Sequence, residues 1–379
     1  MQILVIVMSN CNEDLMTFSD SGDSEVIIEI PQEVRKITTQ AYDKSVFDIV
    51  RMIDDKDIIL DPDFQRNYIW DNKKASMLIE SIILNVPIPV VYVSQEKDDT
   101  WVVIDGLQRL WSLKRFFDGK FKLSGLEILT ELNKQDIHSL NSKALRMLKN
   151  GLLRVIMITH DSNEDIKYDV FMRLNTGSVH LNEQELRNCL YRGSLNTLLK
   201  DLANNSSWLS LLGLKSAHRR MSDREMILRF FAIYTNWDSN KKIVNGYKGR
   251  MKTFLNTFMH TYRNIDKRQN EEWRVLFQNT VEKVIDIFAD SAFRKLSIDA
   301  DKERSINRAI MDILMVSLTK YEKGLLYTKK EIIKEQFYLL LDNNQDFRNS
   351  ILMGTSDTKA LNLRMTIWNE TLANIIVQN

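Results

Sequence analysis

The chain has 379 residues, of which 44% are hydrophobic and 27% are charged, so it is long enough for two domains with hydrophobic cores. Its formal net charge is only +1, which excludes an overall positive field that would hold nucleic acid or a membrane surface. Any such binding must come from a local patch. The two cysteines are too few for a disulfide framework, and they fit a reducing, cytoplasmic location.

The first residues, MQILVIVM, form an apolar run that is too short for a membrane span and lacks the basic start of a signal peptide. A polar segment follows, so we interpret residues 1–35 as a tail with room for one short strand at 25–30, and Met8 as an alternative start. No other segment is apolar enough to cross a bilayer. We expect an α+β protein, with a mixed α/β domain over 36–192 and an all-α domain over 193–379.

Hydrophobic periodicity and turn residues predict the elements of the first domain. In chain order they are helix 45–55, helix 74–85, strand 90–93, strand 102–104, helix 107–117, strand 152–160, helix 165–175 and helix 185–193. A short charged turn joins the two middle strands, which favours a hairpin. Residues 118–151 are polar and are expected to form a subdomain or lid of short helices.

The turn at Asp105-Gly106, between a buried-type strand and a helix, is the strongest candidate for a functional site. If Asp105 is the N-cap, Gln108 falls three residues later, and the pair resembles a capping box. Capping leaves Arg109 unexplained, because a cation in the first turn opposes the helix dipole unless an anion is nearby. A glycine, helix N–H groups and an arginine fork could together hold a phosphate, and ordinary capping is an equally weighted alternative.

A second candidate stretch is DPDFQRNYIW at residues 61–70, where Gln65 and Arg66 stand among three aromatic residues. The simpler interpretation, favoured on this stretch alone, is an aromatic anchor for the core beside a solvated arginine. Under the functional interpretation, Arg66 points into the same pocket as Arg109, since two arginines near one turn repel each other unless an anion lies between them.

A third candidate lies around the chain reversal after the helix at 165–175. Arg173 and Asn175 precede the reversal, and Asn182-x-x-Glu185 is a capping pattern that opens the next helix. Local capping and an ion pair explain Glu185. Capping and one ion pair explain less well why two arginines, Arg173 and Arg187, lie near this reversal.

The second domain is helical throughout in its pattern, and its methionine and aromatic stripes indicate a core. Ser222-x-x-Glu225 and Thr328-x-x-Glu331 resemble further capping boxes. The segment 241–252 is basic and has no acidic residue, so it is interpreted as a solvated loop, with contact to nucleic-acid phosphates as the alternative. The residues concerned are Lys241, Lys242, Lys248 and Arg250.

Several kinds of catalytic centre have no counterpart in the sequence. Nothing matches a phosphate-binding P-loop, a dinucleotide fingerprint, a nucleophile elbow or zinc-ligand spacing. The five histidines are separated along the chain: His138, His160, His180, His218 and His260. A histidine-based nuclease centre is therefore not expected. The carboxylates of Asp61, Asp63 and Asp105 leave open a metal site without histidine.

Five motifs together resemble a known family. In order they are PDFQRNYIW, LIESIILNVPIPVVYV, VIDGLQRL, FMRLNTG and LNEQELRNCLYRG. Their order and spacing are similar to those of the N-terminal domain of GmrSD-type modification-dependent restriction systems, a ParB/sulfiredoxin-like domain of bacterial anti-phage proteins. The resemblance extends over about residues 40–260, since REMILRFFAIY and MKTFLNTFM resemble the helical continuation of that domain.

The resemblance implies a domain that binds a nucleoside triphosphate with Mg²⁺, through a family motif of Asp-Gly-Gln-Gln-Arg. Asp105, Gly106, Gln108 and Arg109 match this motif, and Leu107 replaces its first glutamine, which puts hydrolysis in doubt more than binding. By the same comparison Asp105, Gln108 and Arg109 are the candidate catalytic residues, and Asp105 is the candidate metal ligand. The candidate nucleotide-binding residues are Gln65, Arg66, Gly106, Arg109, Arg173 and Asn175.

The resemblance also implies a separate nuclease subunit as partner, because no segment after His260 resembles the family's nuclease half. The leading hypothesis is a cytoplasmic regulatory or sensor subunit of a modification-dependent restriction system, which responds to a nucleotide and to DNA, with modified phage DNA as one candidate. The alternatives are a non-catalytic ParB-like DNA-binding module, in which arginines and the basic loop contact phosphates, and an adaptor whose motifs are structural.

Overall fold

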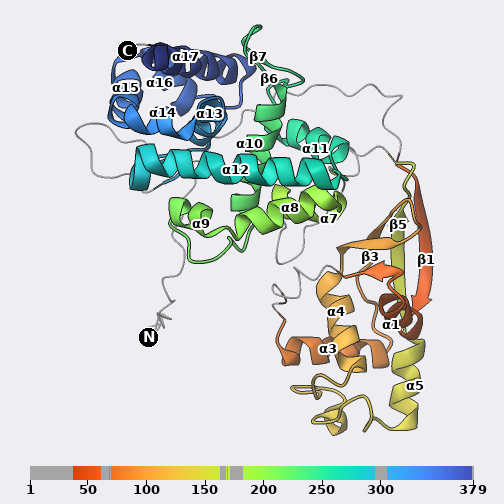
Figure 1. The fold of residues 1–379 in the computed structure, drawn as a ribbon. Helices are drawn as coiled ribbons and strands as arrows, with labels where there is room; N and C mark the ends of the chain where they lie inside the picture. The colour runs from red at the N-terminus through yellow and green to blue at the C-terminus, as the bar shows by residue number, and fades with distance from the viewer. Residues whose placement is uncertain are drawn as a thin grey trace, which may run out of the picture. The chain divides into compact units, whose positions relative to one another are not determined.

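The computed structural model describes residues 37–60, 68, 70–162, 168, 170, 182–294 and 305–377, and these form two compact units. The division between the units falls between Leu190 and Tyr191, just before the boundary expected from the sequence. The architecture is mixed α and β, with an α/β unit followed by a helical unit (Figure 1). The strand expected at 25–30 and most of the helix expected at 165–175 lie outside the described residues.

A five-stranded mixed sheet forms the frame of the α/β unit, with the order β1-β5-β3-β4-β2. Its strands are β1 (Thr39–Ser45), β2 (Ile58–Ile59), β3 (Val91–Gln95), β4 (Trp101–Asp105) and β5 (Leu152–Ile158). β3 and β4 form the expected antiparallel hairpin, β5 runs parallel to β3, and β2 runs parallel to β4. β1 pairs with β5 in antiparallel fashion along its whole length. This mixed pairing places β4 between β3 and β2, and β2 pairs only with the first two residues of β4, Trp101 and Val102.

Helices cover the sheet because its inner strands β3, β4 and β5 are mainly hydrophobic and largely buried. The helices are α1 (Val46–Asp54), α3 (Asn72–Ile83), α4 (Leu107–Phe117), α5 (Ser142–Asn150) and α7 (Glu183–Leu190), with a 3-10 turn, η2 (Thr130–Leu132). Val103 and Val155 join the core that α1, α3, α4 and α5 cover. Val102 and Ile104 alternate with Val103 along β4 and are buried too, and α7 packs against this strand. The site-bearing strand β4 is therefore buried on both faces.

The helical unit is built around its longest helix. Its elements are α8 (Ser194–Ala203), α9 (Ser206–Leu212), α10 (Ser222–Asn236), β6 (Trp237–Asp238), β7 (Ile243–Val244), α11 (Met251–Thr261), α12 (Lys267–Phe288), η3 (Ala289–Ser291), α13 (Arg308–Leu318), α14 (Lys323–Thr328), α15 (Lys330–Asn343), α16 (Gln345–Leu352) and α17 (Thr358–Val377). α12 packs between α8 and α9 on one side and α13, α14 and α15 on the other (Figure 1). The small β6–β7 hairpin was not expected in this unit. No helix in the described part of the chain is long and apolar enough to cross a bilayer.

Candidate functional site

The turn between β4 and α4 depends on a glycine. Gly106 has a φ of +97°, in the left-handed region that other residues rarely adopt. A Cβ atom at this position would lie 3.0 Å from a methyl group of Val91 and 3.2 Å from Nη2 of Arg109. The sharp change from strand to helix therefore requires glycine, both for its backbone conformation and for the space around it.

The prediction that Asp105 caps α4 through a capping box with Gln108 is wrong. Gly106 is the N-cap: its carbonyl accepts a hydrogen bond from the Leu110 N–H at 2.9 Å, and no side chain caps this helix. Because the chain turns left-handed at Gly106, the N-cap lies one residue later than the capping pattern indicated, while the helix spans Leu107–Phe117 as its periodicity predicted. The Gln108 side chain is oriented elsewhere, and its Oε1 lies 3.4 Å from the backbone N–H of Trp70, which donates to it.

Arg109 is bound within the α/β unit. Its Nη2 donates to Asp105 Oδ2 at 2.9 Å and to the Val90 carbonyl at 3.1 Å, and its Nη1 donates to the Pro89 carbonyl. Only 9% of Arg109 is exposed, and burial lowers its pKa while Asp105 opposes that shift. The anion expected near Arg109 is thus Asp105, and the guanidinium connects α4 to the segment that enters β3.

The described aromatic residues of the second candidate stretch, Tyr68 and Trp70, pack on α4 and α3. The hydroxyl groups of Tyr68 and Ser112 are 2.8 Å apart, and the Arg115 guanidinium lies 4.8 Å from the centre of the Tyr68 ring. Lys74 Nζ lies 4.8 Å from the centre of the Trp70 ring. These contacts support the anchoring interpretation for the described residues of this stretch. Gln65 and Arg66 lie outside the described residues, and so does the expectation that Arg66 faces Arg109.

α7 is a polar helix buried against β4. The capping box at its start is confirmed, because Asn182 Oδ1 accepts from the Glu185 N–H at 2.9 Å and Glu185 Oε2 accepts from the Asn182 N–H at 2.7 Å. Arg187 is fully buried and donates to Gln184 Oε1 at 3.0 Å and to Glu183 Oε2 at 2.9 Å. These two partners were missed in the sequence, although they stand three and four residues before the arginine, at helix-neighbour spacing. Arg173 and Asn175 lie outside the described residues.

Side chains that could bind a metal ion are not clustered in the described residues. No group of three or more His, Cys, Asp or Glu side chains that could hold a metal ion occurs in the described parts of the chain. The Asp105 carboxylate, 31% exposed, has a guanidinium 2.9 Å away, whose positive charge opposes a nearby cation. Asp105 as a metal ligand therefore stays a prediction, and no chemical step is assigned to a metal here. Asp61 and Asp63 lie outside the described residues.

The basic segment at 241–252 is closer to acidic residues than its sequence indicated. Lys241 Nζ lies 3.6 Å from Asp238 Oδ2, and Lys242 Nζ lies 2.6 Å from Glu370 Oε1, a residue far along the chain. The charges of these two lysines are therefore partly balanced. Lys248 is exposed and Arg250 is half-buried, further along the same segment.

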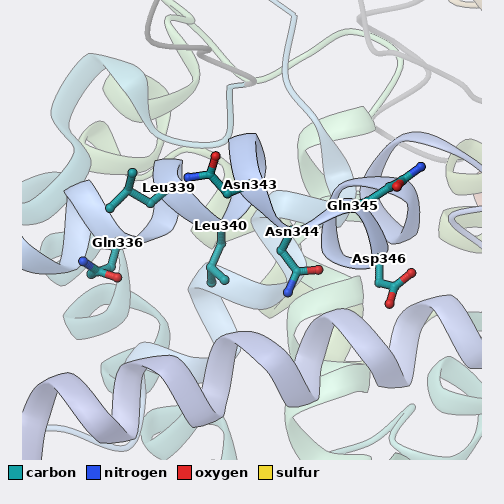
Figure 2. Close-up of a pocket in the computed structure, with 7 residues that line it drawn as sticks. All are labelled: Gln336, Leu339, Leu340, Asn343, Asn344, Gln345 and Asp346. Atoms are coloured by element: carbon teal, nitrogen blue, oxygen red, sulfur yellow. The ribbon is translucent and has the colours of Figure 1, made fainter.

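A shallow hollow of about 490 Å³ lies where α15 passes into α16 (Figure 2). It is lined by Gln336, Leu339, Leu340, Asn343, Asn344, Gln345 and Asp346. The labelled side chains are spread along the two helices and do not converge on one point (Figure 2). None of the residues singled out in the sequence lines this hollow, and it carries no functional assignment.

The glycine turn, the arginine and aspartate pair, the aromatic anchors and the polar helix α7 all lie in the segment that a family comparison identifies. Residues 46–192 match the family model of the GmrSD restriction endonuclease N-terminal domain. The GmrSD match thus confirms the resemblance over residues 46–192, and it connects the α/β unit with restriction systems. It ends where the helical unit begins, so residues 193–379 lie outside the matched segment. The comparison with curated proteins found no match, and the comparison with solved structures found none either.

Proposed function

We propose that this chain is the nucleotide-responsive regulatory subunit of a restriction system and acts with a separate nuclease. The family match supports the restriction context. The observation that carries the nucleotide part is the β4–α4 turn, where a left-handed glycine starts an 11-residue helix that no side chain caps. Such a helix start attracts phosphate through its N–H groups and its dipole.

The turn residues have different roles in this proposal. The first N–H groups of α4 bind the phosphates, and Gly106 provides the left-handed turn from which the helix starts. Gln108 is the candidate side-chain contact. Arg109 and Asp105 hold the turn in place, because their hydrogen bonds and ion pair lie within the unit. They are therefore proposed as positioning residues, although the motif resemblance suggested catalytic roles for both.

Leu107 makes hydrolysis the open part of the proposal. It stands where the family motif has its first glutamine, and an aliphatic side chain cannot orient a water molecule. We expect the chain to bind nucleotide with slow turnover, and Leu107→Gln to raise the turnover. Initial rates of phosphate release by the two proteins, measured at saturating nucleotide, compare them directly. Equal rates would mean that this position does not limit hydrolysis.

The main experiment gives the purified full chain each nucleoside triphosphate in turn, with and without modified DNA. Turnover or binding of a nucleotide supports the proposal. DNA binding without any nucleotide binding supports the alternative of a ParB-like DNA-binding module. If the chain binds neither nucleotide nor DNA, the adaptor is the remaining alternative. Either of these two outcomes overturns the nucleotide assignment.

A matched pair of variants tests whether the nucleotide binds at the β4–α4 turn. Gln108→Ala removes a side chain in the first turn of α4 and is expected to weaken binding by about 1 kcal/mol, the value of one hydrogen bond. Gln95→Ala is the control: this glutamine pairs with the start of β4 and donates to Asp99 in the hairpin turn. Titration calorimetry with both variants tests the position, and an equal loss in the two would contradict it.

A further inference from the structure

The basic segment of the helical unit meets the start of α17. The hydroxyl of Tyr247 donates to the Ser356 carbonyl, and the Val244 N–H donates to Asn362 Oδ1 at 3.0 Å. A Cβ atom on Gly249 would lie 3.5 Å from Thr358 Oγ1 and 4.0 Å from the Thr358 backbone nitrogen. The β6–β7 hairpin and the loop after it therefore lie beside the first turn of this 20-residue helix (Figure 1).

A fully buried arginine lies below that turn. Arg364 belongs to α17, and its side chain extends toward the helix start, as helical side chains do. Its Nη1 donates to the carbonyls of Ser350 at 2.9 Å and Thr355 at 2.8 Å. Its Nε and Nη2 are buried without a hydrogen-bond partner.

The positive charge of Arg364 is only partly balanced. Asp312 Oδ2 is 3.8 Å from Arg364 Nη2, but the same carboxylate accepts two hydrogen bonds from Arg229, at 3.1 and 2.5 Å. Two buried guanidinium groups thus share the Asp312 carboxylate, and Glu225 adds a second negative charge that acts on Arg229. Burial lowers the pKa of Arg364 to about 10, although Asp312 opposes the shift. An excess buried charge is unfavourable unless a counter-charge is near, so an anion at this end of α17 would be stabilised.

The surface above Arg364 provides further positive groups. Lys248 is exposed, and Arg250 has a buried Nε without a hydrogen-bond partner. Lys359 stands in the first turn of α17, where a cation opposes the helix dipole in the absence of an anion. Asp357, exposed at the helix start, is the acidic residue that counts against an anion here. The positive groups nevertheless exceed it.

We infer that the first turn of α17 and the 246–250 loop form a phosphate-binding site, with Lys248 and Arg250 as its side-chain contacts and Arg364 as the buried charge beneath it. The phosphate is a backbone phosphate of a nucleic acid or a phosphate of a free nucleotide, since both present the same oxyanion. This site lies in the helical unit, so it is distinct from the proposed nucleotide site at the β4–α4 turn. In this proposal Lys248 and Arg250 contact the phosphate, and Lys241 and Lys242 do not.

The test uses the full chain and two probes. A fluorescein-labelled DNA duplex of about 20 base pairs is titrated by anisotropy at several NaCl concentrations, and pyrophosphate is titrated by calorimetry. The variants are Lys248→Gln and Arg250→Gln, and the control is Lys242→Gln, on the same segment but paired with Glu370. Thermal melts of all four proteins check that the fold is retained.

We expect Lys248→Gln and Arg250→Gln each to weaken duplex binding by about 3- to 10-fold and to reduce the slope of log affinity against log salt by about one. The control should stay within about two-fold of the unmodified chain. Binding of the duplex alone assigns the site to a nucleic-acid backbone, and pyrophosphate binding with the same variant pattern assigns it to a free nucleotide. The proposal is overturned if neither probe binds, or if both variants bind as the unmodified chain does. Gln108→Ala should leave duplex binding unchanged, which separates this site from the β4–α4 turn.

Discussion

Arg109 donates its hydrogen bonds inside the α/β unit, to the Asp105 carboxylate and to two carbonyls ahead of β3. From the sequence this arginine required an anion, and that requirement is met by the residue four positions before it. The i, i+4 spacing of Asp105 and Arg109 was visible in the sequence, but Asp105 had been assigned to the helix cap. Asp105 is not the cap because the chain turns left-handed at Gly106, and no local sequence pattern predicted that backbone conformation.

Removing the Asp105 carboxylate should destabilise the fold. Asp105→Ala leaves a buried guanidinium with carbonyl acceptors only, and we expect the free energy of unfolding of the α/β unit to fall by about 1–3 kcal/mol. Urea denaturation followed by fluorescence measures the change. Asp43→Ala is the matched control, because its pair with Arg154, at 3.2 Å, is half exposed and should contribute less than about 1 kcal/mol. Equal losses of stability in the two variants would show that the buried pair of Asp105 and Arg109 stabilises the fold no more than the exposed pair does.

The glycine at the turn should not tolerate a side chain. Gly106→Ala places a methyl group at a φ of +97° and within 3.0 Å of Val91. We expect a loss of about 1–3 kcal/mol in the free energy of unfolding, the usual range for backbone strain of this kind. Gly246→Ala, also at positive φ but with open space around it, isolates the cost of the backbone angle in the helical unit. A Gly106→Ala protein as stable as the unmodified chain would contradict the steric argument.

Among the helices, the capping patterns read from the sequence had different outcomes. Asn182 and Glu185 form the expected box at α7. Ser222 was wrong as a cap because Met221, in a left-handed conformation, occupies the N-cap of α10. Thr328 was wrong as well, since it is the last residue of α14.

The long periodic segments were easier to predict than the starts of the helices. The helices at 45–55 and 74–85 and the strands around β3, β4 and β5 are confirmed within a few residues. β1 was missed because TQAYDKS has no hydrophobic alternation: it is an edge strand with mostly exposed side chains. The β6–β7 hairpin has two residues per strand, too few for any period to be seen.

The contrast between the two capping patterns can be measured. Asn182→Ala removes an acceptor for a backbone N–H at the buried start of α7, and we expect it to lower stability by about 1 kcal/mol. Thr328→Ala removes a hydroxyl that only donates to the Leu325 carbonyl at the end of α14, and we expect a change below about 0.5 kcal/mol. Thermal melts of both variants give the comparison. If Thr328→Ala lowers the melting temperature more than Asn182→Ala does, the capping box at α7 does not stabilise the fold as proposed.

For the molecule as a whole, the sequence motifs were sufficient to identify the family, but they did not predict the geometry of the candidate site. The resemblance was carried by motifs in the α/β unit, and the family match covers the same segment, residues 46–192. The site residues Gln65, Arg66, Arg173 and Asn175 lie outside the described residues, so their roles stay predictions. The lysine partners Asp238 and Glu370 could not be foreseen together, because Glu370 is 128 positions from Lys242 in the chain.

The proposed division of labour predicts that this chain alone does not cut DNA. Purified protein, with Mg²⁺ or Mn²⁺ and each nucleoside triphosphate, should leave modified and unmodified phage DNA intact, because a separate nuclease supplies the hydrolytic centre. Agarose gels after long incubation are sufficient for the measurement. Cleavage that remains through purification and is lost in Asp105→Ala would assign the nuclease activity to this chain instead.

The central claim, nucleotide binding at the start of α4, is tested most directly by hydrogen exchange of the full chain with and without each nucleoside triphosphate. A phosphate bound to the first turn of α4 shields the backbone N–H groups around Gly106 and Gln108, so their exchange should slow when the nucleotide is present. The account predicts this protection in peptides that cover residues 105–112. Nucleotide binding that protects only the 246–250 loop and the start of α17, or that leaves residues 105–112 unchanged, would contradict it.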